Sequence, residues 1–199
     1  MQHMLQNAGD SFILQHMLQT WLVLSLQLPA APSSARVAAW RRLKLAGAAG
    51  LTNGTWVLPH TLEHQRVFSE VGSSVRAQGG QAFLFAAETL SSDEDTSVRT
   101  RFVDDRAREY DELAEQTRAF LDEMKRETAL EKFTFAELEE VEEDFQKLES
   151  WLGKVRHRDF FAGDRLQKAA AEIERCRAAL AQFAAEVYAR EGVTGGADD

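Results

Sequence analysis

The chain has 199 residues, of which 23 are basic and 32 are acidic, so its formal net charge is −9. A chain of this length buries enough apolar surface to fold without a disulfide or a structural metal, and its single cysteine excludes an internal disulfide framework. Residues 1–90 carry six basic and four acidic residues, a net charge of +2, which leaves −11 for residues 91–199. The first part can therefore approach a polyanion, whereas the second part as a whole repels one.

The N-terminal stretch lacks the features of a targeting signal. No Lys or Arg precedes Arg36, and Gln and His residues interrupt the apolar run between Phe12 and Ala31. Its continuous apolar core, Trp21–Leu26, has the length of a strand and is far too short for a membrane span. The sequence therefore predicts a cytoplasmic protein with no membrane partner. Residues 1–19, which contain the pentapeptide QHMLQ twice, are expected to be a loose extension.

Residues 20–90 show the pattern of a small α/β domain. The apolar run Trp21–Leu28 predicts a strand that ends at Pro29 and Pro32. A helix capped by Ser33 or Ser34 follows, because a serine oxygen can accept an N–H of the first turn. The apolar side of this helix and its stop signal are predicted at Val37, Trp40, Leu43 and Gly47.

The rest of this domain is predicted from its turn signals. Asn53-Gly54 predicts a type I′ hairpin turn, in which both central residues have positive φ, between strands at about 48–52 and 55–58. A second helix begins at Thr61 and runs to about Gln78, and Gln81–Glu88 is a fourth strand. This β-α-β-β-α-β order is that of a ferredoxin-like unit. We therefore expect an α+β fold with a four-stranded antiparallel sheet and both helices on one face.

Residues 91–191 are predicted to be helical. A long helix begins near Ser92, and Thr134 with Glu137 has the spacing of a capping box at the start of the next helix. Asp164 can cap the last helix. Apolar residues repeat every three or four positions in these helices, which predicts a three-helix antiparallel bundle or a coiled-coil hairpin. Residues 192–199 are expected to be a flexible tail. The predicted seams consist of Leu138, Val141, Phe145, Leu148, Leu152 and Val155, and of Leu166, Ala169, Ile173, Cys176, Leu180, Phe183 and Val187.

The first helix concentrates basic residues, which are Arg36, Arg41, Arg42 and Lys44. Such a face can contact phosphates, and each contact makes binding depend on salt. An ordinary solvated helix face has the same pattern. Trp40 is expected in the core rather than as a platform for stacking bases.

The segment Val155–Arg165 places arginines and two phenylalanines at the corner between two predicted helices. Arginines beside a helix N-terminus are typical of an anion site. The alternative is a purely structural corner, in which Phe160 and Phe161 close the end of the bundle and Asp159 holds an arginine.

Other motifs indicate little chemistry. His60 and His64 have a zinc-like spacing but no evident third ligand, and Cys176 lies on an apolar heptad line as a buried thiol would. The sequence contains no nucleotide-binding glycine motif, no nucleophile elbow and no flavin or nicotinamide fingerprint. We therefore expect no metal, no cofactor and no enzymatic activity.

An ordered set of residues between Trp21 and Val187 resembles the N-terminal region of the ChrB chromate-resistance proteins. The resemblance begins with a strand that ends in a proline, a Trp-Arg pair on the first helix, and a glycine turn before a strand that ends in Leu-Pro. It continues in GGQAFLF (Gly79–Phe85), DRAREYDEL (Asp105–Leu113) and RDFFAG (Arg158–Gly163). Full-length family members carry a further C-terminal domain, which this sequence does not reach. The matching positions of the first part are Trp21, Pro29, Arg36, Trp40, Arg41, Leu43, Gly47, Gly54, Leu58 and Pro59.

The resemblance implies a cytoplasmic, non-enzymatic regulator of chromate-resistance genes that binds DNA and responds to chromate. The basic helix would meet DNA phosphates from a homodimer. An oxyanion such as chromate or sulfate would bind at the helical corner, to Arg106, Arg156 and Arg158 with Tyr110. The motif match groups Arg106, Tyr110 and Asp159 in one polar cluster, which is either part of this site or purely structural. The alternative is a protein–protein interaction or scaffold module with a dimerising ferredoxin-like domain.

Overall fold

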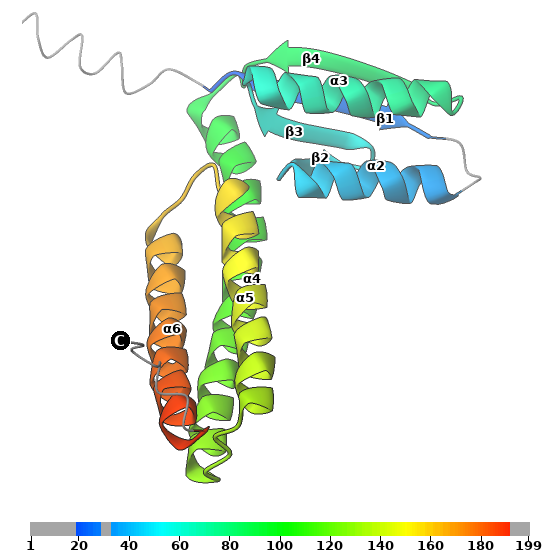
Figure 1. Ribbon diagram of the computed structural model, residues 1–199. Helices are drawn as coiled ribbons and strands as arrows, with labels where there is room; N and C mark the ends of the chain where they lie inside the picture. Colours follow the sequence, from blue (N-terminus) through cyan, green and yellow to red (C-terminus); the bar gives the residue numbers. More distant parts are fainter. Residues whose placement is uncertain (1–18, 29–32, 192–199) are drawn as a thin grey trace, which may run out of the picture. The chain divides into compact units, whose positions relative to one another are not determined.

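The computed structural model describes residues 19–28 and 33–191, which form a four-stranded sheet and five helices (Figure 1). The chain divides into two compact units, with the boundary between Asp105 and Arg106. The predicted loose extension, apart from its last residue, and the predicted tail lie outside the described residues, as do Pro29 and Pro32. No helix in the described ranges is long and apolar enough to cross a membrane.

The first unit confirms the predicted α+β class and the four-stranded antiparallel sheet. The strands lie in the order β2-β3-β1-β4, and each neighbouring pair is antiparallel. In chain order the elements are β1 (Trp21–Gln27), α2 (Ser33–Leu45), β2 (Ala49–Thr52), β3 (Thr55–Pro59), α3 (Leu62–Ala77), β4 (Gln81–Ala87) and the first turns of α4 (Ser92–Ala129).

One face of the sheet is covered by α3, which packs against β1 and β4. Ala82 of β4 faces Gly72 of α3, and Leu22 and Leu24 share this face because alternate residues of a strand point the same way. Both leucines are buried. The core of the unit therefore lies between the sheet and α3.

The opposite face of the sheet is covered at one end by the first turns of α4. Trp21 is buried there and stacks on Phe102, with the ring centroids 5.7 Å apart and the planes at 14°. Its indole Nε1 donates a hydrogen bond of 2.9 Å to Asp95 Oδ1. Asp95 also accepts from Arg99 at 2.6 Å. These contacts explain why the start of a 38-residue helix belongs to the first unit.

The predicted hairpin turn is present between β2 and β3, but its predicted type is wrong. Gly54 has a φ of 80°, whereas Asn53 does not have the positive φ that a type I′ turn requires. A Cβ at Gly54 would lie 2.4 Å from the carbonyl oxygen of Leu26. Glycine is therefore needed at position 54 both for its backbone conformation and for this close approach.

The predicted apolar side of α2 is also wrong in part. The buried residues are Ala35, Ala39 and Leu43, whereas Val37 and Trp40 are 41% and 52% exposed. Because α2 packs against α3, its close contact uses a line of small residues ending in a leucine. Trp40 is thereby left on the solvent side of the helix.

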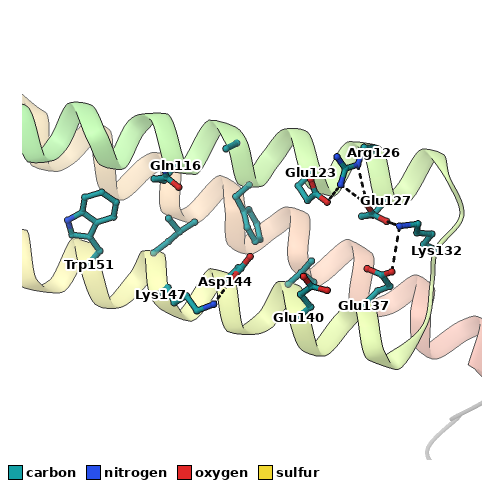
Figure 2. Close-up of a pocket in the computed structure, with 14 residues that line it drawn as sticks. Gln116, Glu123, Arg126, Glu127, Lys132, Glu137, Glu140, Asp144, Lys147 and Trp151 are labelled. Carbon is teal, nitrogen blue, oxygen red and sulfur yellow. Dashed lines mark hydrogen bonds and ion pairs between the residues drawn. The ribbon is translucent and has the colours of Figure 1, made fainter.

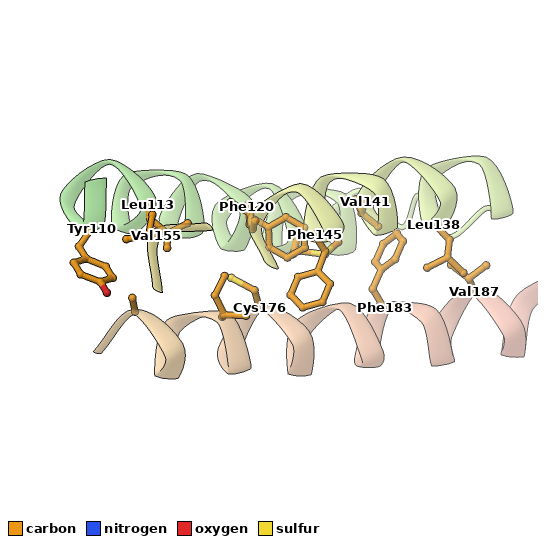
Figure 3. Close-up of a cluster of buried hydrophobic side chains, with 14 of the residues drawn as sticks. Tyr110, Leu113, Phe120, Leu138, Val141, Phe145, Val155, Cys176, Phe183 and Val187 are labelled. Carbon is orange, nitrogen blue, oxygen red and sulfur yellow. The ribbon is translucent and has the colours of Figure 1, made fainter. Parts of the chain in front are cut away.

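The second unit consists of the rest of α4 with α5 (Phe135–His157) and α6 (Asp164–Glu191). Thr134 caps α5 as predicted, because its Oγ1 accepts a hydrogen bond of 3.3 Å from Glu137 N. The three helices share one apolar core, in which the two predicted seams are buried or partly buried (Figure 3). Cys176 lies at its centre, is fully buried and donates a weak hydrogen bond to Thr117 O.

Candidate functional site

The four predicted cations of α2 lie mostly in solvent. Arg36, Arg41 and Arg42 are exposed, and Lys44 is partly exposed. Arg42 forms an ion pair of 2.6 Å with Glu70, and Lys44 forms one of 2.7 Å with Asp105. Within the described residues, the side chain of Arg41 has no hydrogen bond or ion pair.

The exposed Trp40 lies on one helix face with two of these cations. Residues four positions apart share a helix face, so Arg36 and Lys44 flank Trp40, whereas Arg42 lies on the opposite side of α2. An aromatic ring beside cations can contact a base or a sugar while the cations contact phosphates. The expectation that Trp40 belongs to the core is therefore corrected, and its exposure adds an aromatic group to the basic face.

A cluster of charges joins α4 to the end of α5 in the second unit. Glu109 is its centre, because its Oε1 lies 3.0 Å from Arg106 Nη2 and its Oε2 lies 2.7 Å from Arg158 Nη2. One carboxylate thus holds two guanidinium groups that are 52 residues apart in sequence. We refer to Arg106, Glu109, Tyr110, Arg158 and Asp159 as the corner cluster.

The two arginines of the corner cluster have unused hydrogen-bond donors. Arg106 is only 4% exposed, and its Nε and Nη1 have no acceptor among the described residues; the same is true of Arg158 Nε. A buried donor without an acceptor costs about 1–3 kcal/mol. An oxygen atom placed against these groups would therefore be bound favourably.

The other pair of the cluster is Tyr110 and Asp159. Tyr110 Oη donates a hydrogen bond of 2.8 Å to Asp159 Oδ2. Burial raises the pKa of Tyr110 above its ordinary value, and the hydrogen bond to the Asp159 carboxylate raises this pKa further. Tyr110 is therefore a neutral donor at physiological pH, and it fixes the position of Asp159.

The structure brings together four of the five residues predicted for the anion site. Arg156 is exposed in the last turn of α5 and makes no side-chain hydrogen bond with the cluster. Asp159 is held by Tyr110 rather than by an arginine, in contrast to the structural-corner interpretation. Glu109 was missed by the sequence interpretation, although its spacing of three residues from Arg106 on a helix was a usable signal.

A groove of about 590 Å³ runs between α4 and α5 (Figure 2). Its apolar lining includes Phe120, Val141, Leu148 and Trp151. Five carboxylates and three cations surround this lining, so the groove is acidic overall. The carboxylates belong to Glu123, Glu127, Glu137, Glu140 and Asp144, and the cations to Arg126, Lys132 and Lys147.

Among the described residues, some carboxylates of this groove form ion pairs with lysines, and others do not. Lys132 Nζ lies 2.9 Å from Glu127 Oε2, and its hydrogen bond is the main cause that lowers the pKa of Glu127. Lys147 pairs with Asp144 at 2.7 Å. Glu140 has no ion pair in the described part of the chain, and it is one source of the remaining negative charge.

The other three residues singled out in the sequence are Cys176, His60 and His64. Cys176 is buried as predicted, and desolvation raises the pKa of its thiol to about 11. His64 Nδ1 lies 2.7 Å from Pro59 O in hydrogen-bond contact, and His60 is exposed before α3. Among residues 19–28 and 33–191, no group of three or more His, Cys, Asp or Glu residues has the geometry of a metal site.

The fold and these sites define a two-unit α+β protein with a basic helix in one unit and, in the other, a buried and a partly buried arginine that share one carboxylate. Residues 36–194 match the family model described as Protein ChrB, N-terminal, and the chain belongs to this family. Protein ChrB of Cupriavidus metallidurans is 27% identical over 92 residues, which cover 46% of this chain and 28% of that relative. The comparison with solved structures gives no match.

Proposed function

We propose that this chain is a non-enzymatic, DNA-binding regulator of chromate-resistance genes whose second unit binds an oxyanion such as chromate or sulfate. Membership of the ChrB N-terminal family supports the link to chromate resistance. The observation that supports the anion site is the buried guanidinium of Arg106, in which two nitrogen atoms, Nε and Nη1, have no acceptor among the described residues. Guanidinium groups match the oxygen spacing of tetrahedral anions.

In this proposal the oxyanion lies against Arg106 and Arg158, and Glu109 holds both guanidinium groups in place. Glu109 and Asp159 already balance the two positive charges of the cluster. We therefore expect weak binding, in the millimolar range, rather than the tight capture of a cation-only pocket. The exposed Arg156 supplies long-range attraction at the rim of the cluster.

The first unit supplies the DNA contact. Its strand order and its β-α-β-β-α-β chain order support a ferredoxin-like unit, and its exposed cations Arg36, Arg41, Arg42 and Lys44 would meet phosphates. Trp40 would lie between two of these contacts. The regulator would act in the cytoplasm as a homodimer, so that two copies of α2 contact one duplex.

A fluorescence-anisotropy titration of duplex DNA, with and without chromate, tests both parts. We expect Arg41→Ala/Lys44→Ala to weaken DNA binding and to reduce the slope of log K against log salt by about 2, because two phosphate contacts are lost. The control Arg66→Ala/Lys125→Ala removes two cations outside α2 and should leave the slope unchanged. An equal slope for both variants would exclude α2 as the DNA-binding face.

The anion part is tested by Arg106→Gln. We expect chromate and sulfate to change the DNA affinity of the unmodified protein but not that of Arg106→Gln, whereas nitrate, a planar monoanion, changes neither. The control Arg156→Gln removes a cation of the same corner that is outside the hydrogen-bonded cluster, and it should retain most of the response. No direct chromate binding at millimolar concentration in equilibrium dialysis would exclude the sensor role.

The acidic groove favours a second candidate function, a protein-interaction module. An apolar lining surrounded by a net excess of carboxylates fits the apolar and basic faces of an amphipathic helix of a partner protein. A labelled lysine-rich amphipathic peptide should bind, and Glu140→Gln should weaken its binding. Glu139→Gln removes a neighbouring exposed carboxylate that does not line the groove, and it should have no effect.

A further inference from the structure

The sheet of the first unit has an exposed and uncharged patch on the face opposite α3. Side chains of β1 and β4 alternate to place Val23 and Ser25 beside Phe85 and Phe83. The two phenylalanines are 55% and 54% exposed, and their rings stack with centroids 6.5 Å apart. In a chain with 28% charged residues, an uncharged aromatic patch indicates an interaction surface.

The same phenylalanines lie on an edge strand. β4 is last in the order β2-β3-β1-β4, so β1 is its only neighbour in the described sheet. Arg76 Nη1 donates a hydrogen bond of 3.1 Å to Ala82 O, which shows that this carbonyl points toward the outer edge. Backbone groups of alternate residues share an edge, so the N–H and C=O groups of Leu84 and Ala86 point outward as well. These groups can pair with a further strand.

We propose that β4 pairs with β4 of a second copy of this chain, antiparallel and centred on Leu84. The outward-pointing groups of Leu84 and Ala86 would then form the ladder between the two copies, together with Ala82 O, which accepts from Arg76 and has a second lone pair. In this register Phe83 lies opposite Phe85 of the second copy, and Phe85 lies opposite its Phe83. Aromatic residues directly opposite each other stabilise antiparallel pairs. The edge is thus complementary to itself, as a two-fold interface must be.

The charges around β4 favour a second copy as the occupant. Ala82 would face Ala86 of the second copy, so Arg76 would reach the end of the partner strand, which Glu88 follows. Glu88 follows the last residue of β4 and is exposed, and its Oε1 accepts a hydrogen bond of 3.3 Å from Thr20, which leaves its other carboxylate oxygen for Arg76 of the second copy. The two-fold axis would form this Arg–Glu contact twice.

Two other features favour a second copy of this chain as the partner of β4. Two copies, each with a net charge of −9, can approach each other at a patch that has no charge of its own. The other edge strand, β2, is only four residues long and has an irregular register between Gly50 and Thr52, which makes it a poor strand for pairing. The inference extends the homodimer of the proposed function by naming its interface.

A matched pair of variants tests the register by light scattering or sedimentation equilibrium. The unmodified chain should have twice its mass of 22.3 kDa at micromolar concentration. Phe83→Lys/Phe85→Lys places like charges opposite each other, and we expect the dimer dissociation constant to rise about tenfold or more. Phe83→Glu/Phe85→Lys replaces the same two exposed residues but places opposite charges across the axis, and it should retain the dimer.

A proline variant tests the backbone ladder separately. The N–H of Ala86 points away from β1, so Ala86→Pro removes a hydrogen bond to the second copy while the pairing of β4 with β1 remains. We expect a monomer with an unchanged circular dichroism spectrum.

Three outcomes would overturn the inference: a monomeric unmodified chain, a dimer that survives Phe83→Lys/Phe85→Lys, or equal dissociation of the two charge variants. Mass is measured without DNA or chromate, so a monomer that still binds DNA would overturn this interface and the homodimer, and it would leave DNA binding by α2 and the oxyanion site standing.

Discussion

The arginines of α2 and those of the corner cluster are the same residue type in opposite environments. Arg41 lies in solvent without an ion pair among the described residues, whereas Arg106 is 4% exposed and shares Glu109 with Arg158. An exposed cation contributes little to folding and stays available to any polyanion. A buried guanidinium must keep its acceptors, so it constrains the fold and selects its ligand by geometry. The two regions should therefore respond very differently to substitution.

The largest loss in the free energy of unfolding is expected for Glu109→Gln. This change removes the one carboxylate that pairs with both the buried Arg106 and the partly buried Arg158, and breaking such a pair leaves uncompensated charge in the protein interior. We expect the free energy of unfolding of the second unit to fall by about 3 kcal/mol. Urea denaturation followed by circular dichroism measures the change.

The same variant can be rescued by an added anion. Sulfate can replace the lost carboxylate as an acceptor for the two guanidinium groups, so it should stabilise Glu109→Gln more than the unmodified protein. Chloride at equal ionic strength is the control for screening. A loss below about 0.5 kcal/mol, the usual size of a surface effect, would show that the cluster behaves like the exposed cations of α2.

Alkaline pH should lower the stability of the second unit, because two buried groups of that unit, Tyr110 and Cys176, lose protons more easily when the protein unfolds. Burial raises the pKa of Cys176 from an ordinary value of 9.0 to about 11, and it raises the pKa of Tyr110 as well. Because the folded state favours the neutral forms, their contribution is fully present below the unfolded pKa values and is lost as pH rises through the folded ones. We expect the second unit to lose roughly 2 kcal/mol between pH 9 and 11.

Thiol reactivity gives an independent measurement of the same burial. Cys176 should not react with Ellman's reagent at pH 8 until the protein unfolds, because its thiol is inaccessible and protonated. Fast labelling of the folded protein would contradict the buried position. In the double variant Tyr110→Phe/Cys176→Ala, the stability of the second unit should no longer fall over this pH range.

The sequence predicted those features whose signals are local. The cap at Thr134 and the strand Gln81–Ala87 depend on neighbouring residues and were confirmed with small shifts. Trp40 was placed wrongly because an apolar repeat at Val37, Trp40 and Leu43 competes with a line of small residues that α3 can approach closely. Periodicity alone cannot decide between two such lines, since the answer depends on the partner helix.

The candidate site was less predictable than the fold for a related reason. The spacing of three residues from Arg106 is a local signal for Glu109, but other carboxylates of α4, such as Glu123 before Arg126, have the same spacing from a cation. The second partner of Glu109, Arg158, is 49 residues away, so the local pattern does not show that Glu109 joins two helices. The exposure of the two phenylalanines in β4 could not be predicted either. QAFLFAA is apolar at every position after its first, so its pattern does not show which face of the strand is covered.

A smaller loss in the free energy of unfolding is expected for Tyr110→Phe. The substitution removes the hydrogen bond to Asp159 while it keeps the buried ring, so we expect a loss of about 1 kcal/mol. Tyr188→Phe, at a tyrosine that is 47% exposed, is the matched control and should be neutral. An equal result for the two tyrosines would show that the corner cluster is solvated in the same way as the surface of α6.

The smallest effect on stability is expected for Arg41→Ala/Lys44→Ala. Arg41 is exposed and unpaired among the described residues, and the pair between Lys44 and Asp105 lies near the surface. We therefore expect the free energy of unfolding to change by less than about 0.5 kcal/mol. Leu43→Ala, between the two positions, removes a side chain that is 1% exposed and should cost about 2–5 kcal/mol. If the double variant were as unstable as Leu43→Ala, the cations of α2 would be part of the fold, and a loss of DNA binding by that variant could no longer be assigned to phosphate contacts.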